Sequence, residues 1–294
     1  LCFSLVYLAP GDPLSAVLPS DASQEIIDIV KAQYGLDQPV FVQYWLWLKH
    51  ALMGDLGQSI SSGRPVADEI GKAIGNSLLL AGLASALAFT VGTALGIFAG
   101  YRHGTATDRG LSALAIAGVS ILHYWLGIVL VAIFSARLNW LPAMGAGPEG
   151  SAGWSLEQVP YVILPVLTLA AMPAGIVMRS VRALVAETLG RDFIVGLTAK
   201  GMGQAAIFRH LVKNIAPTTL AVLGVQLGYL MAGSILVETV FAWPGTGLLL
   251  NTAILQRDIP LLQGTIFVLA MFFVGLNLLV DMLQPLFDPR MKRT

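Results

Sequence analysis

The chain of 294 residues is 56% apolar and only 12% charged, and its mean hydropathy is +0.75. These values exclude an ordinary soluble globular domain and indicate an integral membrane protein. The net charge of zero argues against a surface for nucleic acid, and the single cysteine, Cys2, excludes an intrachain disulfide and a cysteine zinc site.

The N-terminal quarter of the chain is predicted to lie mostly outside the membrane. Residues 1–9 are apolar but fall short of the roughly 20 residues that a span needs, so we expect the remnant of a first transmembrane helix. A cleaved signal peptide is the alternative, and it would require a basic start. Residues 10–74 form a mildly acidic extracytoplasmic segment, in which Ser20 or Ser23 can cap a helix. The aromatic run 43–53 is expected to lie in the membrane interface.

Five uncharged stretches follow, and each can cross a hydrocarbon core about 30 Å thick. They are 76–100, 111–136, 159–178, 215–237 and 259–280. With the truncated first span, the prediction is an all-α polytopic membrane protein with six transmembrane helices. Small residues, among them Gly82, Ala86, Gly92 and Gly96, allow helix backbones to approach closely.

The prolines predict kinks in one span, and the basic residues predict the orientation of the chain in the membrane. Pro160, Pro165 and Pro173 predict kinks in the fourth span. If the chain ends and the polar stretch 187–217 share one side, that side holds eleven basic residues and the other side holds six. The positive-inside rule therefore predicts cytoplasmic termini, a cytoplasmic 187–217 stretch and an outward-facing segment 10–74.

The stretch 187–217 is predicted to form two short helices around a glycine break. Asp192 can cap the first helix, and Gly201 and Gly203 can end it with left-handed backbone. The second helix has an apolar stripe through Ile207, Phe208, Leu211, Val212 and Ile215, and Pro217 is expected to mark the next segment.

A second irregular region follows the fifth span. Residues 243–247 form a turn cluster, and residues 248–255 are expected to be a helix too short to span. We therefore predict that residues 239–263 form an outward-facing re-entrant or interfacial hairpin.

No catalytic pattern is present in the sequence. The Gly71–Lys72 pair lacks the upstream glycine and following hydroxyl of a P-loop, and HExxH and GxSxG are absent. Among isolated ionisable residues, His123 is expected to pack within the third span, Asp281 to cap or pair locally with a cation such as Arg290, and Glu238 to pair with Arg257. The alternatives are a role in transport for His123, contact with the substrate for Asp281, and contact with a cationic substrate or a capture protein for Glu238.

Several segments carry a family resemblance. Thr198-Ala199-Lys200-Gly201, followed by Arg209-His210, Asn214 and Pro217, resembles the cytoplasmic "EAA" loop of ABC importer membrane subunits of the dipeptide, oligopeptide and nickel branch. The phrases YGLDQPVFVQYWLW, GDLGQSI and GRPVADEI resemble the first extracytoplasmic region of its "B" type subunit. The stretches 238–260 and 277–290 also follow the branch's order. This chain departs from the motif because no glutamate stands in the Leu197–Lys200 stretch before Gly201.

The resemblance implies a type I ABC importer transmembrane fold within residues 75–294, in the inner membrane of a prokaryote. It implies a non-catalytic subunit that forms half of a pathway for peptides, nickel or a metal chelate. Its partners would be a homologous "C" type permease, two ATP-binding subunits that hold ATP and Mg, and an extracytoplasmic solute-binding protein. The chain itself would bind no cofactor and no metal.

The loop 187–214 would be the coupling loop that contacts the ATP-binding subunit. The residues assigned to this contact are Phe193, Leu197, Thr198, Ala199, Lys200, Gly201, Met202, Gly203, Phe208, Arg209 and His210. Two other classes stay open on the sequence alone: an ion-coupled secondary transporter or channel, which needs charged relays in the spans, and a structural or receptor subunit that does not transport.

Overall fold

The computed structural model describes residues 39–147 and 156–287. Within these ranges the regular elements are helices, and the only β-type pairing is an isolated bridge between Gln58 and Pro65. The expected all-helical fold is thus confirmed for the described part. The predicted remnant of a first span and the helix capped by Ser20 or Ser23 lie outside the described residues.

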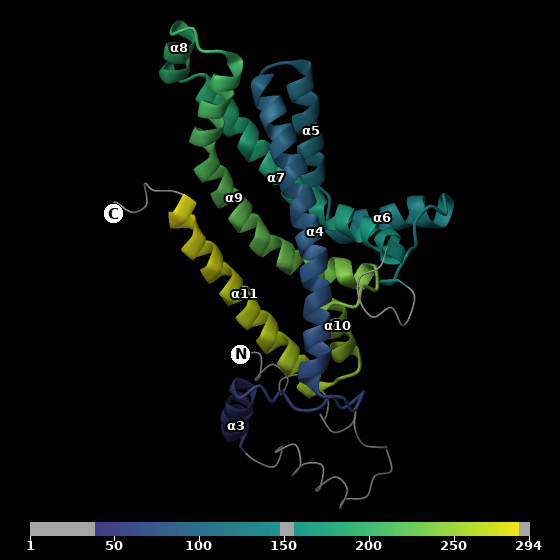
Figure 1. Cartoon of the computed structure of the whole chain (residues 1–294). Coiled ribbons are helices and arrows are strands. Elements are labelled where there is room, and N and C mark those ends of the chain that lie inside the picture. The colour runs from purple at the N-terminus through teal and green to yellow at the C-terminus, as the bar shows by residue number, and fades with distance from the viewer. Residues whose placement is uncertain (1–38, 148–155, 288–294) are drawn as a thin grey trace, which may run out of the picture. The chain divides into compact units, whose positions relative to one another are not determined.

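The chain divides into two compact units. One contains the described residues up to Asn76 together with Pro244–Phe272, and the other contains Ser77–Trp243 with the described residues from Phe273 onward. Two long helices, α4 (Val66–Tyr101) and α11 (Ile259–Phe287), run through the points at which the division falls (Figure 1).

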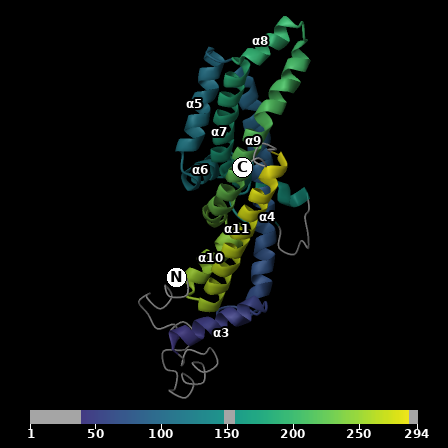
Figure 2. The ribbon, with the colours of Figure 1, turned by 90° about the vertical axis from the view of Figure 1, so that its left-hand side faces the viewer.

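The larger unit is a bundle around helix α7. Its helices are α4 from Ser77 onward, α5 (Ala106–Ser120), α6 (His123–Leu130), a π-helical continuation (Val131–Arg137), α7 (Val159–Leu189), α8 (Asp192–Ala199), α9 (Gln204–Val240) and α11 from Phe273 onward. Helix α7 packs against α5, α6 and α9. Figures 1 and 2 show α8 bridging the adjoining ends of α7 and α9, at the end where α4 turns into α5.

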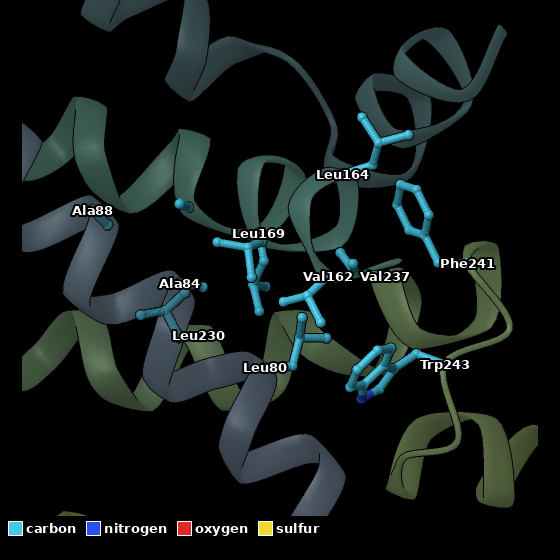
Figure 3. Packing of buried hydrophobic residues seen from close by; sticks show 12 residues of the cluster. Leu80, Ala84, Ala88, Val162, Leu164, Leu169, Leu230, Val237, Phe241 and Trp243 are labelled. Carbon is cyan, nitrogen blue, oxygen red and sulfur yellow. The ribbon is translucent and has the colours of Figure 1, made fainter. Parts of the chain in front are cut away.

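The core of this unit is built from aliphatic side chains with two aromatic rings at one end. Leu80 and Ala84 of α4 meet Leu169 of α7, and Phe241 and Trp243 follow α9 into the same cluster (Figure 3). Both aromatic side chains are almost completely buried. Because lipid tails are as apolar as these side chains, close packing rather than exclusion of water holds such a cluster together.

Glycines spaced four residues apart bring α4 and α7 into contact. Gly92, Gly96 and Gly100 face a row of valines on α7, Val177, Val181 and Val185. A Cβ atom at Gly96 would lie 2.8 Å from the Met178 carbonyl oxygen and 2.8 Å from the Val181 Cβ. The predicted close approach is confirmed at Gly92 and Gly96, whereas a Cβ at Gly82 would meet nothing within 4 Å.

The smaller unit has its own apolar cluster. Its helices are α3 (Val40–Leu52), the beginning of α4, α10 (Thr246–Leu255) and the beginning of α11. Buried residues of the cluster include Ala51, Val66, Ala253 and Leu261. The expected short helix at 248–255 is present and begins two residues earlier, at Thr246. The aromatic run that was expected in the membrane interface lies on α3.

The structure has between two and four candidate membrane spans among its described residues. Val66–Tyr101 and Leu156–Leu189 qualify alone, and two bent helix pairs qualify if each is one span. One pair, α5 with α6 and its continuation, is bent by 102°, so the predicted span over 111–136 is broken into two helices and stays a prediction. Ile121 and Leu122 have extended backbone, and neither residue type signals such a break in an uncharged run.

Prolines lie inside two of the long helices, and the kinks predicted for the fourth span stay a prediction. Helix α7 runs unbroken through Pro165 and Pro173. Pro217 lies inside α9, so the expectation that it marks a new segment after a short helix is wrong. Neighbouring helices and local adjustments let membrane helices tolerate internal prolines. The other bent pair, Gln204–Met231 with Gly233–Val240, belongs to α9 and has an angle of 44°.

Candidate functional site

Helix α8 ends in a defined glycine cap. The Met202 N–H donates to the Leu197 carbonyl oxygen at 3.2 Å, and the Gly201 N–H donates to the Thr198 carbonyl oxygen at 2.9 Å. This pair of bonds is a Schellman motif, and Gly201 has the left-handed backbone, φ +77°, that the motif requires. The predicted left-handed end at Gly201 is confirmed.

Two details of the predicted helix pair are wrong. Gly203 is the N-cap of α9, with φ −68°, and is not left-handed. Asp192 is the first residue of α8 rather than its cap, since Arg191 occupies the cap position without a side-chain hydrogen bond. An aspartate in the first turn still favours the helix through the macrodipole, which explains why the sequence pattern placed the helix correctly.

The residues predicted to contact a partner lie on the accessible side of this loop. Phe193 is 37% exposed and Phe208 is 43% exposed. None of the predicted contact residues is buried: Leu197, Met202 and His210 are partly exposed, and the remainder are exposed. The structure therefore brings the predicted set together on one short helix, its glycine turn and the first turns of α9.

The opposite side of the loop is buried against the bundle. Ile194 of α8 and Ile207 of α9 are buried. Beneath them, Leu211 and Ile215 of α9 join Val185 of α7 in one apolar cluster. Because the inner side of the loop is packed and its outer side is accessible, a force applied to α8 can be transmitted to α7 and α9.

The connector between α4 and α5 lies beside this loop. The Tyr101 ring at the end of α4 and the Phe208 ring on α9 have centroids 6.3 Å apart. Both rings are partly accessible. The contact joins the end of α4, just before the connector, to the beginning of α9.

A buried carboxylate ties the same connector to α7. Asp108 in the first turn of α5 is 1% exposed, and both of its oxygens face the Arg182 guanidinium of α7. The Arg182 Nη2 donates to Asp108 Oδ2 at 2.7 Å, and the second bond runs from Arg182 Nε to Asp108 Oδ1. The Gly104 N–H donates to Oδ2 at 2.9 Å, and His103 Nδ1 lies 3.4 Å from the same oxygen.

Sequence reasoning missed this cluster, although a signal was present. Thr105 and Asp108 have the spacing of a helix-capping pair before an apolar run. In the structure Thr105 is the N-cap of α5, and its Oγ1 accepts from the Asp108 N–H at 3.3 Å. The partner on α7 could not be chosen from sequence, because several arginines were assigned to the same side of the membrane.

A second carboxylate organises the smaller unit. Asp258, just before α11, is fully buried. Its Oδ2 accepts the Ser59 hydroxyl at 2.6 Å, the Ser61 N–H at 2.9 Å and the Ser61 hydroxyl at 2.9 Å. Its Oδ1 accepts the Leu261 N–H at 3.1 Å and so caps α11.

The electrostatics of Asp258 follow from these bonds. Burial raises the pKa of its carboxyl, but the hydrogen bonds from Ser59, Ser61 and Leu261 outweigh burial, and the net effect lowers the pKa. Asp258 is therefore charged at neutral pH. It holds residues 59–61 on the turn before α11.

The isolated ionisable residues have mixed outcomes. His123 is the first residue of α6, and a Cβ at Gly233 of α9 would lie 3.9 Å from its ring, which agrees with the expected packing position. Glu238 is fully buried in the larger unit. Its expected partner Arg257 belongs to the smaller unit, so that pairing stays a prediction. The side chain of Asp281 lies outside the described residues.

Comparison with known sequences assigns most of the chain to one group. The sequence model of the family described as "binding-protein-dependent transport system inner membrane component" matches residues 92–293. A second model, described as the N-terminal part of a binding-protein-dependent transport system membrane component, matches residues 1–81. Together the two matches cover both structural units.

Individual proteins show the same likeness over nearly the whole chain. The glutathione transport system permease protein GsiC of Escherichia coli O6:H1 is 36% identical, over 99% of this chain and 92% of that protein. The dipeptide transport system permease protein DppB of Alkalihalophilus pseudofirmus is 34% identical, over 99% of this chain and 93% of that protein.

A solved structure shares the fold. A chain of the MetNI methionine ABC transporter, in an inward-facing conformation, matches with a TM-score of 0.61 at 14% identity. The match covers 74% of this chain and 96% of that chain.

Proposed function

Because the chain belongs to the family of binding-protein-dependent transport system inner membrane components, we propose that its loop 187–214 receives the motion that ATP drives in a partner subunit. We also propose that its substrates are peptides or a related small solute. The chain is a non-catalytic permease subunit of an ABC importer in the inner membrane. Family membership decides against an ion-coupled secondary transporter or channel and against a subunit that does not transport.

The observation that carries the coupling proposal is the two-sided construction of the loop. Its outer side presents Phe193, Lys200 and Phe208 to solvent, while Ile194 and Ile207 anchor its inner side. A partner that grips the outer side moves the ends of α7 and α9 with it, because both helices share one apolar cluster below the loop. Closure of the ATPases would thus be converted into motion of the spans.

The remaining assembly is proposed from the family. A binding-protein-dependent system contains an ATPase and a binding protein as partners. We propose that the other half of the pathway is a homologous "C" type permease, and that two ATP-binding subunits hold ATP and Mg. We further propose a six-span type I arrangement with loop 187–214 and both termini in the cytoplasm. In that orientation, segment 10–74 and hairpin 239–263 would face outward, where the binding protein arrives.

The substrate class rests on the relatives. One of the two relatives named above is a glutathione permease and the other a dipeptide permease, and each matches 99% of this chain. Both names describe transport of short peptides. We propose a short peptide as the substrate, with nickel or a metal chelate as the other solute class of this branch.

The coupling proposal is tested at Gly201 with two substitutions. Valine is strained at φ +77°, whereas asparagine tolerates left-handed backbone, and a side chain here meets nothing within 4 Å. Gly201→Val should therefore distort the glycine turn without a clash, and Gly201→Asn should preserve it. The full importer is reconstituted in proteoliposomes with dialanine and glutathione as probes.

We expect Gly201→Val to insert and assemble but to lose uptake and the ATP hydrolysis that the binding protein stimulates, with Gly201→Asn close to the unsubstituted protein. Wild-type uptake by Gly201→Val would contradict the coupling role of the loop. Failure of the unsubstituted importer to transport either probe, while its binding protein captures a metal chelate, would contradict the peptide assignment.

A further inference from the structure

We propose that Asp108 and Arg182 are positioning residues for coupling, which make the α4–α5 connector move together with α7 and the coupling loop. The inference rests on the proposed role of loop 187–214. It concerns two residues outside that loop that the comparisons do not assign, and its basis is the geometry of their buried ion pair.

The first step of the argument is the contrast between two ion pairs that involve α7. Glu187 near the end of α7 and Arg191 at the N-cap of α8 form an exposed pair four residues apart, with a distance of 2.6 Å. Such pairs contribute little to stability and join nothing distant. Asp108 and Arg182 are 74 residues apart in sequence and connect different helices, and Asp108 is 1% exposed.

The second step is what the pair connects. Asp108 also accepts from the Gly104 N–H, and Gly104 has φ +82°, so the carboxylate holds the turn of the connector as well as the first turn of α5. Arg182 lies two turns before the end of α7, which leads directly into α8. One side chain therefore joins the α4–α5 connector, α5 and α7 at the end of the unit where the loop lies.

The third step is a separate contact between the same elements. The Tyr101 ring touches the Phe208 ring, and Phe208 belongs to the predicted contact set. Below it, Gly100 of α4 packs against Val185 of α7, where a Cβ atom would lie 2.6 Å from the Val185 Cβ. The end of α4, which leads into the connector, thus meets both helices that flank α8. A charged bidentate bond adds directional rigidity that these apolar contacts lack.

Stability alone does not account for a buried ion pair at this position. A buried ion pair gains little over apolar packing in stability, because desolvation offsets the attraction between the charges. Its distinguishing property is a fixed relative orientation of the two helices. Without it, a push on α8 can move α7 while α4 and α5 lag behind.

The test uses the full importer in proteoliposomes with dialanine and glutathione as probes. The variants are Asp108→Asn, Arg182→Lys and the swapped pair Asp108→Arg with Arg182→Asp. The matched control is Arg109→Gln, which removes an exposed charge from the neighbouring residue. Uptake and ATP hydrolysis are both measured per assembled complex, so that a loss of assembly does not enter the result.

We expect Asp108→Asn and Arg182→Lys to lower the number of probe molecules taken up per ATP by roughly fivefold or more. The swapped pair should recover part of this ratio, and Arg109→Gln should leave it unchanged. A purely structural role would reduce the amount of complex and leave the ratio as it was. An unchanged ratio in both single variants overturns the inference, whatever the yield.

The outcome at Gly201 separates this inference from the proposed function. If Gly201→Val uncouples transport and the Asp108 and Arg182 variants do not, only the positioning role is wrong. If Gly201→Val transports normally, the coupling role of the loop fails first, and a reduced ratio in Asp108→Asn would then report a route that does not pass through α8.

Discussion

The carboxylate of Asp258 accepts the hydroxyl of Ser59 at 2.6 Å, although 199 residues separate them in the sequence. The bond fastens the loop before α4 to the turn before α11. Ser61 adds two more hydrogen bonds to the same oxygen. The first and last parts of the smaller unit are therefore held together by one buried charge.

Replacing Asp258 by asparagine should loosen this loop. Asparagine removes the charge and offers donors where Ser59 and Ser61 also donate, so we expect a loss of about 1.5–3 kcal/mol of local stability. Hydrogen–deuterium exchange of residues 57–65 in the purified importer measures the effect. Asp55→Asn is the control, because the hydrogen bond that the structure gives the exposed Asp55 carboxylate comes from the Gly57 N–H, two residues away. Equal protection in the two variants would contradict the anchoring role of Asp258.

A valine at Gly96 should separate α4 from α7. Its Cβ would meet a carbonyl oxygen and the Val181 Cβ at 2.8 Å, and neither atom is the free end of a flexible side chain. Overpacking of this kind costs about 1–3 kcal/mol. Gly82→Ala on the same helix is the control and should be neutral or slightly stabilising, because its Cβ meets nothing within 4 Å. Thermal unfolding in detergent compares the two, and the prediction fails if both melt at the same temperature.

The two central tryptophans of α3 should behave differently. The centroids of the Trp47 and Phe267 rings are 5.4 Å apart in a T-shaped arrangement. Trp47→Ala should therefore lower the free energy of unfolding by about 2 kcal/mol. Trp45 is 55% exposed, so Trp45→Ala should leave unfolding nearly unchanged.

Trp45 also tests the prediction that α3 lies in the membrane interface. In that position its fluorescence should be quenched by lipids brominated near the headgroups. Absence of quenching, with quenching of other tryptophans in the same sample, would place α3 away from lipid.

The helices and the turn of loop 187–214 were largely predictable because their signals are local. The polar interruption, the glycine at 201 and the apolar spacing in 207–215 identified two helices and a left-handed turn without knowledge of the rest of the chain. The errors at Gly203, Asp192 and Pro217 concern helix boundaries, where caps and neighbouring packing decide between similar local choices. The helix break at Ile121 could not be predicted either, because a straight and a bent apolar segment have the same composition.

By itself, the sequence determined that this protein is a helical membrane protein, which segments are apolar enough to enter lipid, and which loop is accessible and rich in cations. Composition and short-range periodicity carry that information. Only the tertiary structure showed that Asp108 pairs with Arg182 and that Asp258 accepts hydrogen bonds from Ser59 and Ser61. It also showed that Gly96, unlike Gly82, lies against a neighbouring helix. These choices depend on which distant backbones come within a few ångströms of each other, and that proximity is a property of the packed helices together rather than of any one segment.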